Sequence, residues 1–341
     1  MSSLVFNGDN ISVKRESRRL ILSRKNRETD SEETLTAPMH DIDRVTVVGH
    51  PSIPVSVFQT FMKDGIPVSF ISEKGRWYGT LFSDGDKNAR RRLRQYQIHY
   101  SYDPRLSFAK KLIYSKIRNQ RRVLQRLAAN RKLTEEDEHK SAMRILRTSS
   151  RNVESVQSAE ELLGVEGYAA AVYFKRLARF FPENFPFQNR NRRPPRDAAN
   201  AMLSWTYSIV LSEIETAVKV QGLDSCIGFF HEITPGKPSL SLDLLEPLRA
   251  PVCDLLVLNI LNHRIMNEKD FRQGDNGGIY INEEGRKKFF QQYEPHMQRA
   301  FKMQGRSEVT DFRKEITQQV WNVLRFLGSS ELIPPDFFQM P

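Results

Sequence analysis

The period of the apolar positions changes near residue 85. Before that point, short stretches in which apolar and polar residues alternate predict β-strands, among them "RRLILSR", "DRVTVVG", "IPVSFIS" and "RWYGTLF". Asn7 and Gly8 lie between two further stretches, and this pair favours a tight hairpin turn. In the segment "PVSVFQTFMKDG", Pro54 suits the first turn of a helix and Gly65 suits its end, which predicts one short helix. We therefore expect residues 1–84 to form a small β-sheet domain.

After residue 85 the apolar positions recur at helical spacing. In "LSFAKKLIYSKIRNQRRVLQRLAANRKL", Ile113 and Ile117 fall on one face, which predicts a long amphipathic helix. Asp197 and Gly222 are typical of the cap and the end of a second long helix. The sequence therefore predicts an α+β protein, in which the N-terminal β-sheet domain is followed by a larger, all-helical C-terminal domain over residues 85–341.

Composition excludes several classes of protein. Hydrophobic residues make up 39% of the 341 residues, which is too many for a disordered chain. No apolar run approaches the roughly 18 residues that cross a membrane, and the start "MSSLVFNGDN" lacks the features of a secretory signal. Cys226 and Cys253 are the only cysteines, which is typical of a reduced compartment. We expect a cytoplasmic protein with no membrane partner.

Basic residues outnumber acidic ones by 52 to 41, and the excess is concentrated in two places. Arg121 and Arg122 lie in a helical segment where acids are nearly absent, so neighbouring residues cannot neutralise them. A second cluster, at Arg190, Arg192 and Arg193, lies in a proline-rich loop. Such clusters favour a polyanionic partner, most often a nucleic acid, although a solvated charged face is the simpler alternative.

One acidic residue interrupts the apolar face of the segment "LLGVEGYAAAVYF". Ser158 and Glu161 have the spacing of a capping box, and a helix that starts there places Glu166 on its apolar side. A carboxylate in that position is costly without a partner, and Gly164 and Gly167 each cost the helix about 1 kcal/mol relative to alanine. Two interpretations remain. Either a metal ion and phosphates approach this helix, or a buried Glu–Arg pair accompanies a close helix–helix contact.

Three more candidate ligands lie in "GFFHEITPGKPSLSLDLLEPLR". His231 ends a buried stretch. At such a position a histidine more often forms its hydrogen bonds within the core or a loop than binds a metal. Asp243 and Glu246 are three residues apart among leucines, so they repel each other unless a cation lies between them. Arg249 is one possible cation. Pro247 disfavours a continued helix at the residue before it and predicts a bend there.

These residues form a mixed set of carboxylate and imidazole ligands, which suits Mg²⁺ or Mn²⁺. Such an ion in a basic surround polarises a phosphodiester and activates an attacking hydroxyl group. The sequence alone does not show that the segments carrying Glu166, His231 and the Asp243/Glu246 pair meet in space.

Three blocks of the chain resemble a known family. "LLGVEGYAAAVYF", "RPPRDAANAMLSWTYSIV" and "GLDSCIGFFHEITPGKPSLSLDLLEPLR" are similar, in order and spacing, to the signature blocks of the CRISPR-associated adaptation integrase. This is a metal-dependent DNA nuclease-integrase that inserts new spacers into CRISPR arrays. The family has an N-terminal β domain and a C-terminal helical domain, so the resemblance extends over the whole chain.

The resemblance implies a role for each candidate residue. Glu166, His231 and Glu246 look like the three metal ligands and catalytic residues; the third ligand is often Asp in other members. Asp243 is similar to a further acid of the motif, either an alternate ligand or a support. Arg249 and Arg193 look like nucleic-acid contacts, in addition to Arg121 and Arg122 of the basic helix.

The resemblance also implies an activity and partners. A 3′-hydroxyl of a short DNA duplex would attack the phosphodiester at a CRISPR repeat boundary, so double-stranded and branched DNA are the expected substrates. The protein would form a homodimer through residues 1–84 and assemble on a small second adaptation protein. Two alternatives are a non-catalytic DNA-binding scaffold, which needs no metal, and a metal-dependent RNase, which prefers RNA to branched DNA.

Overall fold

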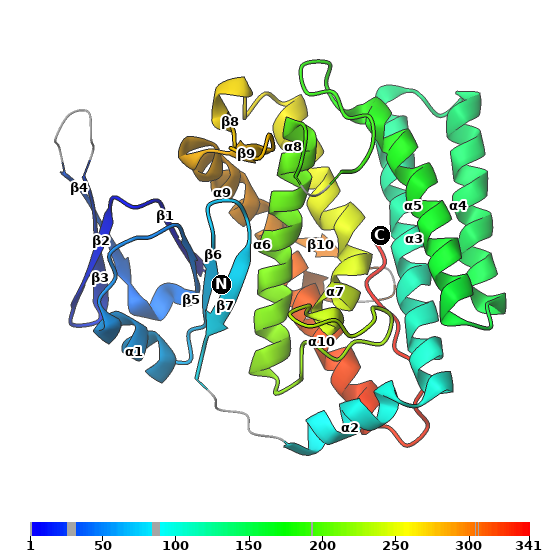
Figure 1. The fold of residues 1–341 in the computed structure, drawn as a ribbon, viewed down its shortest axis with the longest axis horizontal. Coiled ribbons are helices and arrows are strands. Elements are labelled where there is room, and N and C mark those ends of the chain that lie inside the picture. Colours follow the sequence, from blue (N-terminus) through cyan, green and yellow to red (C-terminus); the bar gives the residue numbers. More distant parts are fainter. Residues whose placement is uncertain (1, 26–31, 84–88, 192–193, 304, 306) are drawn as a thin grey trace.

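The computed structural model describes residues 2–25, 32–83, 89–191, 194–303, 305 and 307–341. Its class is α+β, which confirms the sequence prediction: strands gather in the first part of the chain and helices dominate the rest (Figure 1). The elements of the first part are β1 (Ser2–Asn7), β2 (Ile11–Glu16), β3 (Arg19–Lys25), β4 (Glu32–Pro38), the 3₁₀ turn η1 (Met39–Asp41), β5 (Ile42–Val48), α1 (Val55–Lys63), β6 (Val68–Ile71) and β7 (Trp77–Leu81).

The strands of the first part form two sheets. One has the order β1-β5-β6-β7, with β6 and β7 antiparallel and the other pairs parallel; the other is the antiparallel sheet β2-β3-β4. The predicted hairpin at Asn7 and Gly8 is therefore wrong, because the chain passes there from one sheet to the other. Gly8 does have the left-handed conformation of a turn (φ = 105°), and its N–H donates to the Val48 carbonyl (3.1 Å).

The second part is mostly helical. Its elements are α2 (Ala89–His99), α3 (Tyr102–Arg131), α4 (Asp137–Ser155), α5 (Ala159–Leu177), η2 (Ala178–Phe180), α6 (Ala198–Val220), α7 (Ser239–Leu245), η3 (Glu246–Leu248), the π-helix η4 (Arg249–Asp254), α8 (Leu255–Asn262), η5 (Glu268–Asp270), β8 (Phe271–Gln273), β9 (Ile279–Ile281), α9 (Glu283–Gln298), β10 (Phe301–Lys302), β11 (Val309–Thr310) and α10 (Phe312–Gly328).

The expectation of an all-helical second part needs a correction. β8 pairs with β9 and β10 with β11, each as a small antiparallel sheet. These strands contain only two or three residues, which is too short for an alternating pattern to be recognised. Across the ranges that the structure describes, no helix has the length and apolar character needed to cross a membrane.

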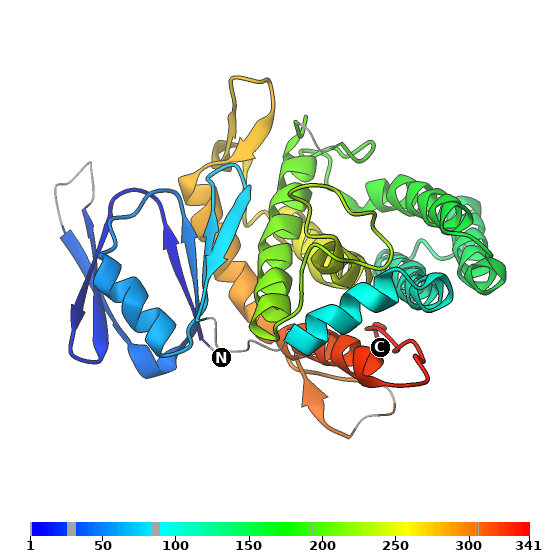
Figure 2. The same ribbon diagram turned by 60° about the horizontal axis from the view of Figure 1, so that its bottom comes forward.

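The helix α6 lies between the sheets and the other helices (Figures 1 and 2). It packs against β6 and β7 and also against α7, α8 and α10. Val48 and Ile71 of the four-stranded sheet are buried in the main helical core, while a second core, which includes Phe6 and Phe61, lies around α1. The two parts therefore share packing, although the chain connects them through residues 84–88, outside the described residues.

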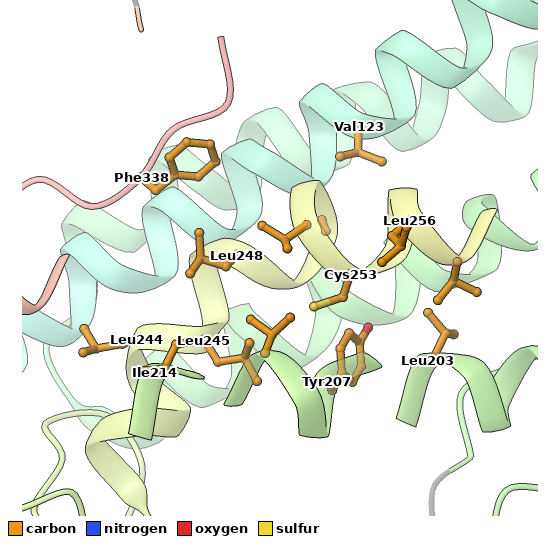
Figure 3. Close-up of a cluster of buried hydrophobic side chains, with 14 of the residues drawn as sticks. Val123, Leu203, Tyr207, Ile214, Leu244, Leu245, Leu248, Cys253, Leu256 and Phe338 are labelled. Carbon is orange, nitrogen blue, oxygen red and sulfur yellow. The ribbon is translucent and has the colours of Figure 1, made fainter. Parts of the chain in front are cut away.

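A leucine-rich segment at the centre of the main core positions the candidate site. Figure 3 shows the leucines of α7 and η3 between α3 and α6. Leu244, Leu245 and Leu248 are each no more than 1% exposed. Because these leucines fix the segment on both sides, the acids placed among them have defined positions and directions.

A buried ion cluster joins the N-terminal sheet to the helices. Arg44 on β5 and Arg313 on α10 both pair with Glu213 on α6, and the contact from Arg313 Nη2 to Glu213 Oε1 is 3.1 Å. Tyr293 donates a hydrogen bond to the same oxygen (2.9 Å). Burial opposes the charge of Glu213, but the two guanidinium groups outweigh it and lower the pKa of Glu213.

Candidate active site

Glu166 lies in the middle of α5, whose start follows the predicted cap. Ser158 Oγ accepts a hydrogen bond from the Glu161 N–H (3.1 Å), and the Glu161 carboxylate reaches back to the N–H of Gln157 (2.8 Å). The Glu166 side chain is 19% exposed. A Cβ added to Gly164 or Gly167 would meet nothing within 4 Å, so no helix packs closely on either glycine within the described chain. The side of α5 that carries the two glycines is therefore not covered by another described element.

Asp243 organises the loop that carries His231. One carboxylate oxygen accepts hydrogen bonds from the N–H groups of Phe229 (2.6 Å) and Phe230 (3.0 Å). The other accepts one from the N–H of His231 (2.9 Å) and lies 2.7 Å from His231 Nδ1. Gly228 permits this close approach, because a Cβ there would lie 2.6 Å from Asp243 Oδ2.

The contact with Asp243 also selects the tautomer of His231. An ionised carboxylate can only accept hydrogen bonds, so Nδ1 of the imidazole carries the proton. The lone pair of the neutral ring is then on Nε2, which lies 3.8 Å from Glu246 Oε1. Asp243 thus contacts His231 and its loop, whereas His231 directs its free nitrogen toward Glu246.

Glu246 lies where the type of helix changes. α7 ends at Leu245, and the chain continues as the 3₁₀ turn η3 and then as the π-helix η4. Pro247, which has no N–H to donate, follows directly, so the predicted break of the α-helix is confirmed. Asn119 on α3 donates to the Pro247 carbonyl (2.7 Å) and fixes the turn. The Glu246 side chain is only 5% exposed.

A lysine that sequence reasoning missed lies between the two glutamates. Lys116 Nζ on α3 forms ion pairs with Glu166 Oε1 and, at 2.5 Å, with Glu246 Oε2. The Lys116 side chain is 9% exposed. Its position three residues after Ile113 places it on the buried face of α3, and this signal is hidden by the many solvent-facing basic residues of the same helix. The buried pair expected for Glu166 therefore exists, with lysine in place of arginine.

Arg249, expected as a nucleic-acid contact, is instead part of the interior of the site. Its Nε donates to Glu246 Oε1 (3.0 Å), and its guanidinium lies over the Tyr207 ring, 4.7 Å from the centroid. The Tyr207 hydroxyl donates in turn to Asp254 (2.6 Å), which also accepts from Tyr173 (2.7 Å). Because Arg249 is paired and stacked, its contacts hold Glu246 in place.

The surrounding charges keep Glu246 ionised. Burial alone would raise its pKa, but the nearby side chains, above all the charged Arg249 and Lys116, lower it to about 2. Asp254 behaves in the opposite way, because burial raises its pKa to about 6 despite the hydrogen bonds from two tyrosines. At neutral pH, Glu246 is therefore a carboxylate, as a metal ligand must be.

The donor groups of this cluster fit a divalent cation. Glu246 Oε2 is buried and, although close to Lys116, makes no well-directed hydrogen bond. His231 Nε2 has a lone pair, and Glu166 approaches from another helix. Within the described residues, no three acidic, histidine or cysteine side chains surround one point as ready ligands. The ammonium of Lys116 lies between two of the candidates and pairs with both.

Comparison with known proteins identifies the family. Residues 4–295 match the model of the family described as CRISPR associated protein Cas1. The chain belongs to the Cas1 family. The CRISPR-associated endonuclease Cas1 1 of Thermodesulfovibrio yellowstonii is 34% identical over 284 residues, which cover 83% of this chain and 88% of that protein. The resemblance seen in the sequence is thus confirmed.

Solved structures share the fold of this Cas1-family chain. A casposase bound to integration product has a TM-score of 0.85 at 24% identity and covers 99% of this chain and 95% of its own. A Cas6-RT-Cas1–Cas2 complex has a TM-score of 0.77 at 23% identity, with 98% of this chain and 36% of that chain covered. These likenesses extend over both the β-sheet part and the helical part.

Many basic residues of this Cas1-family chain have structural partners. Arg91 and Arg94 on α2 donate to the carbonyls of Gln221 (2.9 Å) and Leu327 (3.2 Å), at the ends of two helices. Arg190 turns inward and donates to side chains of α6, at Asn200 (2.8 Å) and Ser204 (2.9 Å). Arg193 lies outside the described residues. The excess of basic residues in the sequence therefore overstates the surface available for nucleic acid.

One group of arginines lies close together on α3 and α4. Arg121 lies near Arg118, Arg122 and Arg147, and burial together with these three charges lowers its pKa. We call these four residues the arginine cluster. Among the described residues, no Asp or Glu side chain forms an ion pair with them, although Arg122 Nε donates to the Pro341 carbonyl oxygen (3.0 Å). Their mutual repulsion favours an anionic partner at α3 and α4.

Proposed function

We propose that this Cas1-family protein joins the 3′ ends of a short DNA duplex to a CRISPR repeat by metal-dependent transesterification, and that it also cuts branched DNA. The observation that supports the proposal best is the convergence of Glu166, His231 and Glu246 from segments far apart in the sequence. Glu166 and Glu246 share one cation, and His231 directs its free nitrogen toward Glu246. Such a set of donors, in which Glu166 remains partly exposed, suits chemistry on a phosphodiester.

In this proposal, Glu166, His231 and Glu246 would hold Mg²⁺ or Mn²⁺. The ion supplies Lewis-acid polarisation of the phosphodiester and activation of the attacking 3′-hydroxyl. The protein orients the donors: Asp243 keeps the proton on His231 Nδ1, and Arg249 holds one oxygen of Glu246. The reaction exchanges one P–O bond for another, so it needs no external source of energy.

The experiment that tests this function is integration of a labelled duplex into a plasmid that carries the repeat. With Mg²⁺ or Mn²⁺ we expect labelled plasmid, and with a chelator none. A non-catalytic scaffold would bind the duplex and leave the plasmid unlabelled with either metal. A metal-dependent RNase would cleave an RNA hairpin faster than a branched DNA of the same sequence, and this result would replace the proposal.

Reversing the charge of Arg121 and Arg122 together is expected to weaken binding to duplex DNA by about 10-fold or more at moderate salt, because each phosphate contact releases counterions. The loss should be similar for unrelated DNA sequences, and the dependence of affinity on salt should become less steep. Fluorescence anisotropy over a salt series measures both. Reversal of Arg15 and Arg19, which lie in the β2-β3-β4 sheet, is the control. An unchanged salt dependence would show that the arginine cluster is not the contact.

Asp243→Asn is expected to reduce metal affinity and DNA joining by about 10- to 100-fold, the usual effect of losing a residue that orients a ligand. Asparagine offers one acceptor oxygen, whereas the Asp243 carboxylate accepts from three backbone N–H groups and His231 Nδ1. Calorimetric titration with Mn²⁺ and the integration assay measure the two effects. The exposed Asp275→Asn variant is the control. Full metal affinity in Asp243→Asn would exclude the supporting role.

We also propose a homodimer formed through residues 1–84 and docking of a small adaptation partner. The Cas6-RT-Cas1–Cas2 complex, which has the same fold, supports the second part. The edge strand β4 supports the first, since its Leu35 is 61% exposed and an edge strand readily pairs with another chain. Light scattering of the full chain measures the dimer. Deleting residues 1–83 is a poor test, because it removes Val48 and Ile71 from the main core.

A further inference from the structure

Two carboxylates of the candidate site share one cation that belongs to the protein. Glu166 on α5 and Glu246 on η3 both pair with Lys116 Nζ, which reaches them from a third helix, α3. The other oxygen of Glu246 is held separately by Arg249 (3.0 Å). Lys116 is therefore the group that neutralises the side of Glu246 that faces Glu166.

The burial of this arrangement makes the cation necessary. The side chains of Lys116 and Glu246 are 9% and 5% exposed. Two carboxylates this close to one another in a medium of low dielectric cannot both stay ionised without a positive charge between them. An ammonium group is compact and concentrates its charge at one point, so it resembles a metal ion more closely than a guanidinium does.

The oxygens that Lys116 contacts are those that a divalent ion would need. Mg²⁺ binds carboxylate oxygens at about 2.0–2.1 Å, closer than any ammonium contact, so both cations cannot lie between Glu166 and Glu246 at once. The contact between Lys116 and Glu246 Oε2 is an ion pair that lacks the direction of a good hydrogen bond. The lysine side chain is long and flexible enough to withdraw without movement of α3.

We propose that Lys116 competes with the divalent ion for Glu166 and Glu246, so that it holds the two ligands together until the ion displaces it. This inference rests on the proposed function, because it takes these residues to be the metal ligands. When a binding-competent arrangement is populated only in part, the apparent affinity falls by that fraction. Lys116 therefore weakens metal binding while it stabilises the protein in the presence of a chelator.

Lys116→Met is the test, because methionine has a similar length and no charge. Calorimetric titration with MnCl₂ should give an affinity about 10-fold or more above that of the wild-type protein. Thermal unfolding in a chelator should give a lower Tm for the variant, and Mn²⁺ should raise this Tm by much more than it raises that of the wild type. Lys111→Met is the matched control, since Lys111 lies on the same helix and is 48% exposed. It should leave both measurements unchanged.

Each other outcome overturns the inference in a recognisable way. If Lys116→Met binds Mn²⁺ with unchanged or weaker affinity while the wild type joins DNA only with metal, Lys116 is not a competitor and the proposed function stands. If no variant binds Mn²⁺ and the wild type joins DNA in a chelator, the metal site fails and the inference fails with it. Should Lys116→Met not fold without metal, Lys116→Gln keeps a hydrogen-bond donor and should show the same rise in Mn²⁺ affinity.

Discussion

Glu166→Ala is expected to reduce DNA joining by about 10³-fold or more, since loss of a ligand removes the several kcal/mol that a bound ion contributes to the transition state. The fold should survive. The Glu166 side chain is partly exposed, and after its removal Lys116 still pairs with Glu246, so no buried charge loses its only partner. The integration assay, together with thermal unfolding in a chelator, measures the two properties independently.

The controls for this variant come from the same cluster and the same helix. Glu160→Ala removes an exposed acid in the first turn of α5 and should leave joining unchanged. Glu246→Ala should abolish joining too, but it should also lower stability, because both Lys116 and Arg249 lose a buried partner. Full activity of Glu166→Ala would rule out the proposed ligand set, whatever the other variants do.

Glu213→Ala is expected to lower the free energy of unfolding by about 3–5 kcal/mol, the usual cost of removing one member of a buried ion pair. Arg44 and Arg313 would both lose the carboxylate of Glu213 as a partner. Arg313 would still pair with Glu294 (2.8 Å). Denaturant titration measures the loss. Glu232→Ala breaks a surface pair with Arg105, where Glu232 is 74% exposed, and should change stability little. An equal effect of the two substitutions would contradict this account.

The same cluster predicts how stability depends on pH. The pKa of Glu213 is lower in the folded protein than in the unfolded chain, so its ionised form favours folding. This contribution is fully present above the unfolded value of about 4.3 and is lost as the pH falls through the lower, folded value. The difference in stability between the wild type and Glu213→Ala should therefore shrink on acidification below about pH 4.

Local patterns in the sequence were sufficient for most elements of the fold. The caps at Ser158 and Asp197 form as predicted, because a cap depends only on residues within one turn. The hairpin at Asn7 and Gly8 was wrong because strand pairing is decided by burial against distant partners. β1 pairs with β5, some 40 residues further along the chain, and no local turn signal contains that information.

The acidic residues of the candidate site could be predicted from the sequence, whereas its lysine could not. Carboxylates on apolar faces are rare, so Glu166 and Glu246 stood out from the leucines and alanines around them. Lys116 did not, because it is one of many basic residues on α3 and only the three-dimensional packing shows that it points inward. Arg249 was predicted in two ways. Its spacing offered it as a cation for Glu246, which its contacts with Glu246 and Tyr207 confirm, whereas the resemblance implied a nucleic-acid contact.

The two glycines of α5 make the folded protein less stable than it could be. Alanine would fit at Gly164 and at Gly167 without meeting another atom within 4 Å, and each replacement would favour the helix by about 1 kcal/mol. An engineer who sought a more heat-resistant variant would choose these two positions first. Both are neighbours of Glu166 in the sequence, but residues one and two positions apart lie on different faces of a helix, so the added methyl groups would stand away from the Glu166 carboxylate. Heat resistance and turnover can therefore be changed independently at this helix, and libraries selected for melting temperature should accept alanine at both positions without loss of DNA joining.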